Sequence, residues 1–134
     1  MNTFGVAVKA VIKNKEGKYL VLMKSSKDDI NPNTYDIPGG RMIFGEQPEE
    51  TIVREVKEET GLDIKLLKIL EVWTFTKKDF QLVGINFLCE QIGGELKLGE
   101  EHDSAKWYTY EELTTGDSFP EWLVNTIKKT SDLN

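Results

Sequence analysis

The chain has 134 residues, of which 39% are hydrophobic and 30% charged, and its formal net charge is -6. This size and composition predict a single globular domain over residues 1–134 and exclude a disordered chain. The acidic balance disfavours binding to duplex nucleic acid, and no apolar segment approaches the roughly 18 residues needed to span a bilayer, so no membrane partner is expected.

Cys89 is the only cysteine, which excludes an internal disulfide and a cysteine zinc site. It lies in an apolar run, where a small buried residue is expected, so we assign it to the core. The first five residues lack a basic segment followed by an apolar stretch and a cleavage site. We therefore expect no signal peptide and a cytoplasmic location.

The first third of the chain has strand and loop patterns. Phe4–Lys13 and Tyr19–Met23 are rich in β-favouring residues and are separated by Asn14–Gly17, which has turn chemistry, so they predict a β-hairpin. Lys24–Asp36 has no periodicity, and a loop of that length is expected to form one wall of a site. Gly39–Gly40 predicts a turn that lets the backbone approach a ligand closely.

A helix is predicted to begin near Pro48 and to end at Gly61. Proline suits the first helical position, where its missing N–H would have no partner, and glycine suits the position just past a helix. Ile52, Val53 and Val56 fall on one arc and predict the apolar stripe that anchors this helix.

The second half alternates strands with one more helix. Lys65–Thr76, Gln81–Glu90 and Lys106–Tyr110 read as strands, and Phe119–Lys129 has the apolar spacing of an amphipathic helix. The order of strands, helix, strands and helix predicts an α/β fold with a mixed sheet packed between helices.

Three carboxylates share one face of the first predicted helix. A rotation of about 100° per residue places Glu55, Glu58 and Glu59 in one arc. Two carboxylates near 4 Å repel by about 4 kcal/mol at an effective dielectric of 20, and Arg54 can offset only part of this. A solvated acidic face explains this cluster less well than a site for a multivalent cation, and oxygen ligands match Mg²⁺ or Mn²⁺.

The same helix carries a family resemblance. Gly40, five residues, Glu46, seven residues and then the run Arg54–Leu62 resemble the signature of the MutT-like Nudix hydrolase family at every defined position. The approach to this box, Tyr35–Gly40, is also similar to the family's, with Tyr35 where a Trp is common. The resemblance implies an α/β/α sandwich and a metal-dependent pyrophosphohydrolase. The substrate would be a small nucleotide, a nucleoside diphosphate linked to another moiety, such as a nucleoside triphosphate or a nucleotide sugar.

The resemblance also implies residue roles. The metal would be held by Glu55, Glu58, Glu59 and the backbone around Gly39. Arg54 and Glu46 would orient the helix carboxylates, and Gly40 and Gly61 would support the motif. Tyr35 and Arg41 are expected to contact the substrate. The alternative is a non-catalytic nucleotide-sensing domain on the same fold, and the sequence leaves a homodimer open.

The general base is assigned less directly. Glu55 is the first candidate, and Glu58 and Arg54 join it as expected catalytic residues. Glu101 lies in the acidic stretch Gly99–Asp103, where many family members place a further metal-binding or catalytic acid. An exposed acidic loop explains this stretch equally well. His102, the only histidine, is expected at the surface or beside the ligands, and neither as a ligand nor as a base.

Overall fold

The computed structural model describes residues 1–27 and 32–131, so residues 28–31 of the predicted loop Lys24–Asp36 lie outside the described residues. The strands are β1 (Thr3–Lys13), β2 (Tyr19–Lys24), β3 (Tyr35–Asp36), β4 (Gly39–Arg41), β5 (Leu62–Lys77), β6 (Phe80–Gly94) and β7 (His102–Tyr108). The helices are α1 (Pro48–Thr60), α2 (Tyr110–Thr114) and α3 (Glu121–Lys128). No helix within the described ranges is both long and apolar enough to cross a membrane.

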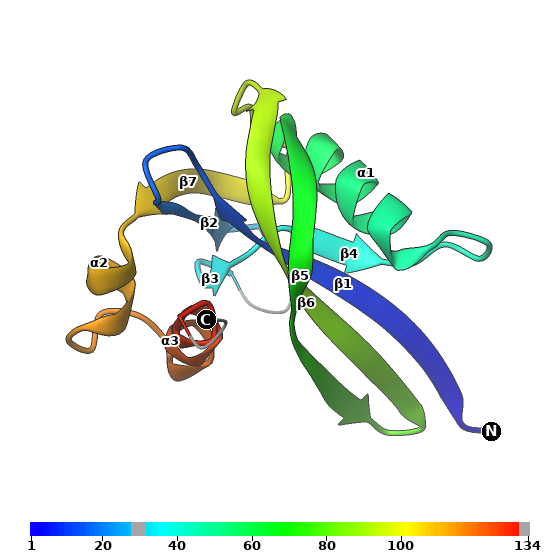
Figure 1. The fold of residues 1–134 in the computed structure, drawn as a ribbon. Helices are drawn as coiled ribbons and strands as arrows, with labels where there is room; N and C mark the ends of the chain where they lie inside the picture. Colours follow the sequence, from blue (N-terminus) through cyan, green and yellow to red (C-terminus); the bar gives the residue numbers. More distant parts are fainter. Residues whose placement is uncertain (28–31, 132–134) are drawn as a thin grey trace.

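The sheet is mixed and is built around β1. This strand pairs in parallel with β6 from Thr3 to Lys13, and β6 pairs with β5 in an antiparallel hairpin. On the other side, β2 carries β3 and β7 as antiparallel neighbours. Helix α1 covers one face of the sheet, while α2 and α3 cover the other (Figure 1). The predicted α/β/α sandwich is therefore confirmed.

Alternation along the strands divides the core into two halves, because successive side chains of a strand point to opposite faces. The half under α1 includes Val8, Ala10, Ile12, Leu20, Leu22, Ile52, Val56, Phe87 and Cys89. The half under α2 and α3 includes Val11, Tyr19, Val21, Ile37, Leu88, Leu113, Leu123 and Ile127. The prediction that Cys89 belongs to the core is confirmed. Both faces of the sheet are buried, which fixes its register on both sides.

The predicted hairpin between the first two strands is wrong for most of its length. β1 and β2 pair only at Lys13 and Tyr19 and then diverge. The edge of β1 beyond this point is taken by β4, which pairs with residues Ala7–Lys9. The hairpin opens because a later segment of the chain competes for the same backbone groups.

The predicted turn at Gly39–Gly40 is also wrong, because both glycines lie in β4. A Cβ atom at Gly39 would lie 2.1 Å from the carbonyl oxygen of Val8, which leaves room for glycine alone. The glycines therefore bring β4 against β1 and beneath α1.

The bounds of α1 agree with the prediction. Gln47 and Glu50 form a capping box before Pro48, and Gly61 ends the helix at a positive φ of 78°. Val53 departs from the predicted stripe, since its side chain is 44% exposed while Ile52 and Val56 are fully buried. The buried stripe continues instead through Glu59 and Thr60, toward the cavity described below.

The end of the chain also differs from the prediction. β7 begins at His102, four residues earlier than predicted, and α2 was not expected. This short helix is started by Thr109, which forms a capping box with Glu112.

Candidate active site

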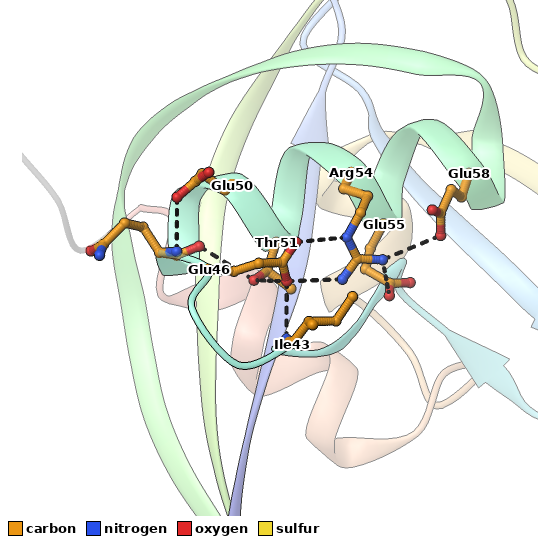
Figure 2. Close-up of polar contacts among 8 residues, drawn as sticks. Ile43, Glu46, Glu50, Thr51, Arg54, Glu55 and Glu58 are labelled. Atoms are coloured by element: carbon orange, nitrogen blue, oxygen red, sulfur yellow. Dashed lines mark hydrogen bonds and ion pairs between the residues drawn. The ribbon is translucent and has the colours of Figure 1, made fainter.

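Arg54 of α1 holds three carboxylates (Figure 2). Its Nε and Nη2 atoms donate to the two oxygens of Glu46 at 2.8 and 3.0 Å. Its Nη1 atom donates to Glu55 at 2.9 Å and to Glu58 at 3.4 Å. Such a fork fixes direction as well as charge, so Arg54 sets the positions of Glu55 and Glu58.

Glu46 anchors this fork to the loop before α1. It also accepts hydrogen bonds from the backbone N–H of Ile43 at 3.0 Å and from the hydroxyl of Thr51 at 2.8 Å. The hydrogen bonds from Arg54, with that from Ile43, lower the pKa of Glu46 to about 2. The same contacts raise the pKa of Arg54. Both groups stay charged over the physiological pH range.

Two carboxylates of α1 lie against the two adjacent glycines of β4. A Cβ atom at Gly40 would lie 2.6 to 2.8 Å from the carboxylate of Glu55, so glycine is what lets this acid approach β4. The backbone N–H of Gly39 donates to Glu59 at 3.0 Å. Glu55 and Glu59 therefore lie side by side along β4, as the helical spacing predicted.

Glu59 differs from the other two acids in its surroundings. It is only 7% exposed, whereas the side chain of Glu58 is 60% exposed. Burial raises the pKa of Glu59 to about 8, and the charges of Glu101 and Glu55 add to this effect, while the Gly39 hydrogen bond and Lys9 oppose it. Without a cation nearby, Glu59 keeps its proton at neutral pH.

The end of α1 positions the acidic stretch Gly99–Asp103. The carbonyl oxygens of Glu59 and Thr60 accept the backbone N–H groups of Gly99 and Lys97 at 3.1 and 2.8 Å. These bonds satisfy helix carbonyls that have no partner within the helix. They also place Glu101 beside Glu59, where both carboxylates and His102 offer ligand atoms within 4.8 Å of one another.

A cavity of about 420 Å³ lies over this group of acids. It is lined by Lys9, Lys24, Ser25, Lys27, Asp36, Gly39, Glu59, Glu100, Glu101 and His102. The described part of the loop after β2 thus forms one wall, as its length predicted. Acids and lysines face the same space, a mixture suited to a cation bound together with a phosphate group.

His102 is the residue whose placement the sequence predicted least well. It is 5% exposed, so of the two expected positions the one at the surface is wrong, and the one beside the acids remains. Its Nε2 atom lies 2.9 Å from Asp36 Oδ2, and its Nδ1 atom lies 3.8 Å from Glu59 Oε1. Asp36 also accepts from Lys9 at 3.0 Å, and despite its burial these contacts lower its pKa. No spacing in the sequence links these residues.

Tyr35 and Arg41 do not line this cavity. The Tyr35 ring packs against Phe119, with 5.0 Å between centroids, at the edge of the core under α2 and α3. Arg41 lies over the ring of Phe80, 4.7 Å from its centroid, beyond the glycines of β4. Their predicted contact with a substrate stays a prediction.

The donor set fits a divalent cation. A buried carboxylate, Glu59, and an exposed one, Glu101, converge on one wall of the cavity, and the buried Nδ1 atom of His102 has no hydrogen-bond partner. Glu55 does not line the cavity; Gly40 leaves room for its carboxylate beside β4, and Arg54 holds it there. Of the predicted ligands, Glu59 and Gly39 line the cavity, whereas Glu58 lies outward on Arg54.

Comparison with known proteins places the chain in a family. The family model described as NUDIX domain matches residues 3–129. An ADP-ribose pyrophosphatase of Methanocaldococcus jannaschii is 36% identical over 110 residues, which are 81% of this chain and 63% of that protein. The nucleoside triphosphatase NudI of Escherichia coli is 27% identical over 114 residues, 76% of this chain and 80% of that protein.

The fold comparison agrees with the family model. The crystal structure of a MutT protein from Methanosarcina mazei superposes with a TM-score of 0.83 at 25% identity, covering 98% of this chain and 95% of that one. The chain spans less than two thirds of the length of the M. jannaschii relative. The match over nearly the whole chain, together with the Arg54 fork and the acids of α1, shows that the chain belongs to the Nudix hydrolase family.

Proposed function

We propose that the protein is a divalent-metal-dependent pyrophosphohydrolase that cleaves a nucleoside diphosphate linked to another moiety. The observation that carries this proposal is the alignment of Glu55 and Glu59 against the glycines of β4, with Arg54 fixing the first of them. Glu59 lines a cavity that also has lysines, and a pair of acids held in this way at its side suits a metal-bound diphosphate.

The metal would be held by Glu55, Glu58, Glu59 and the backbone of Gly39, with Glu101 close enough to Glu59 to join them. We propose Mg²⁺ or Mn²⁺, because these donors are oxygens. Bound there, such an ion lowers the pKa of water and neutralises charge on a leaving phosphate. Glu58 is exposed and reaches this position by turning away from Arg54.

The residues of the chain position the reacting groups. In the hydrolysis a water oxygen bonds to phosphorus, the bond from phosphorus to the bridging oxygen breaks, and the water proton passes to a carboxylate. Glu55 is the first candidate for that carboxylate, because Arg54 and Gly40 fix it in place. Glu101 is the second candidate. It is exposed and lines the cavity, so it can meet a water on the side away from the sheet.

The lysines of the cavity suit the anionic part of the substrate. Lys9 is held by Asp36 at 3.0 Å and by the carbonyl oxygen of Ile37 at 3.1 Å. Lys24, the last residue of β2, and Lys27 line the same cavity and are placed to contact the outer phosphate or a sugar phosphate. The names of the two relatives, an ADP-ribose pyrophosphatase and a nucleoside triphosphatase, support a substrate with a nucleoside diphosphate group.

A substrate panel tests this proposal. Nucleoside triphosphates, nucleotide sugars and ADP-ribose are incubated with Mg²⁺ or Mn²⁺, and the products are identified by chromatography and mass spectrometry. The proposal expects two phosphate-containing products from at least one substrate, with ¹⁸O from labelled water in one of them. Nucleotide binding without turnover under every metal condition would contradict it and favour the nucleotide-sensing alternative.

A homodimer and a cytoplasmic location are proposals that depend on the sequence alone. Light scattering on the purified chain gives its mass in solution, and a mass of one chain, 15.3 kDa, would contradict the homodimer. A tagged chain followed by cell fractionation tests the location.

A further inference from the structure

His102 lies at the start of β7 with its ring turned into the cavity wall. The register between β2 and β7 shifts at this point, because Met23 pairs with Ser104 and Lys24 with His102, which leaves Asp103 as an extra residue. Such a bulge turns the side chains beside it. Asp103 is exposed, and the ring of His102 is buried between Asp36 and Glu59.

The contacts of His102 determine which ring nitrogen carries the proton. Nε2 lies 2.9 Å from one oxygen of Asp36, and the other oxygen of Asp36 accepts from Lys9 at 3.0 Å. The Asp36 carboxylate is thus an acceptor in an ion pair, so Nε2–H is the donor. Nδ1 is left with a lone pair that points toward Glu59.

This lone pair has no partner in the protein. Among residues 1–27 and 32–131, Nδ1 of His102 is the buried side-chain polar atom without a hydrogen bond. Glu59 Oε1 is 3.8 Å away, too far for one. Leaving a buried polar atom without a hydrogen-bond partner lowers the stability of the fold by about 1 to 3 kcal/mol. The unpartnered Nδ1 atom therefore indicates that a group from outside the protein binds it.

We propose that Nδ1 of His102 is a metal ligand together with Glu59 and Glu101, and that this centre prefers a first-row transition ion to Mg²⁺. The proposal rests on the metal requirement of the proposed function and adds a nitrogen donor to it. Imidazole suits transition ions, whereas Mg²⁺ keeps oxygen ligands and water. Asp36 fills the role of the carboxylate that orients a metal-binding histidine through its other nitrogen.

The distances are compatible with one ion. The three ligand atoms lie within 4.8 Å of one another. Donors at about 2.0 to 2.2 Å from one ion are at most about 4.4 Å apart, so the group needs to contract by roughly half an ångström. Glu101 is exposed and can make this movement, while Asp36 and Gly39 hold His102 and Glu59 in place.

Nitrogen-15 NMR of the intact protein tests the proposal directly. His102 is the only histidine, so every imidazole signal comes from this residue. In metal-free protein we expect Nε2 to be protonated and Nδ1 to be bare. Zn²⁺ should shift the Nδ1 signal, and excess Mg²⁺ should leave it in place. A protonated Nδ1, or an Nδ1 signal that saturating Zn²⁺ does not move, would overturn the proposal.

Metal titration of variants provides a second measurement. His102→Gln should weaken Co²⁺ binding, followed by calorimetry, by about 10- to 100-fold and change Mg²⁺ binding by less than about twofold. Asp103→Asn is the matched control, because it removes the adjacent carboxylate, which lies outside the donor group, and should leave both affinities unchanged. Equal losses for Co²⁺ and Mg²⁺ in His102→Gln, or no loss for either, would overturn the nitrogen ligand.

The proposed function can fail separately from this inference. If the protein hydrolyses a nucleotide with Mg²⁺ while Zn²⁺ does not shift the Nδ1 signal, only the assignment of His102 as a ligand is wrong. If Zn²⁺ shifts Nδ1 and no substrate is hydrolysed with any metal, the nitrogen ligand stands and the pyrophosphohydrolase is wrong.

Discussion

Replacing Glu59 with Gln should separate the stability of the protein from its metal chemistry. The glutamine has the same size and keeps an oxygen that can accept the hydrogen bond from Gly39 N–H, which Glu59 accepts at 3.0 Å in the parent. It removes the charge that burial disfavours and that a metal needs. We therefore expect a metal-free variant that is more stable than the parent and nearly inactive.

The size of the stability change follows from the pKa of Glu59. The pKa is raised from 4.5 to about 8, and one pKa unit is worth about 1.4 kcal/mol. Because the folded pKa lies above the unfolded one, the contribution of Glu59 is fully present below pH 4.5 and is lost as the pH rises toward 8. At pH 7 this loss is about 3 kcal/mol, which Glu59→Gln should recover, while near pH 4 the two proteins should be equally stable.

Urea unfolding with a chelator, repeated between pH 4 and pH 8.5, measures this difference. In thermal unfolding at pH 7 we expect a gain of roughly 9 °C in Tm for the variant, from about 3 °C per kcal/mol in a domain of this size. Glu90→Gln, an exposed acid on β6, is the control and should leave the pH profile unchanged. If the free energies of unfolding of the parent and of Glu59→Gln change with pH in parallel, burial does not raise the pKa of Glu59. Activity retained above about a hundredth of the parent's would refute its role as a ligand.

Three further changes test the surroundings of the metal. Arg54→Lys keeps the charge but loses the two-point contact with Glu46, so kcat should fall by about 10- to 100-fold with a smaller change in KM. An unchanged kcat would mean that Arg54 only neutralises charge. Gly40→Ala puts a methyl group 2.6 Å from the Glu55 carboxylate, and this flexible side chain can move away. Activity should therefore fall at least about 10-fold, while the free energy of unfolding in urea falls by less than about 1 kcal/mol. Unchanged activity would show that Glu55 is not part of the site. Glu101→Gln should lower kcat by about 10-fold or more, measured beside Glu95→Gln, an exposed acid outside the cavity lining; identical kinetics in the two variants would return Glu101 to the surface.

Local rules predicted the parts of the fold that depend on local contacts. The bounds of α1 are set by Pro48, the Gln47 capping box and Gly61, all within one turn of the helix ends. The strands of the second half were also found, because alternation and β-favouring residues mark them. Register was harder, since β1 is completed by β6, more than 70 residues away in the sequence, and by β4. No local pattern around Phe4–Lys13 shows that competition.

The site divides in the same way. The acids of α1 follow from helical rotation, and the family resemblance implied that Arg54 and Glu46, which are in contact here, orient the helix carboxylates. Their partners come from other elements. His102 needs a bulge in β7 to face Glu59, and Asp36 needs β3 to lie beside β2. A single histidine beside an exposed acidic stretch gives no periodic signal, so the sequence left its position open between the surface and a place beside the ligands.

The charges in the cavity explain how an acidic chain can bind an acidic substrate. Lys9 is held by Asp36, and Asp36 in turn holds His102, so this lysine stabilises the residues of the proposed metal site. Lys24 and Lys27 line the same cavity and can contact phosphate. A cation at Glu59 would neutralise the acids around it, and the cavity would then attract an anion. Substrate affinity should therefore depend on the metal, even though the net charge of -6 repels the substrate elsewhere on the surface.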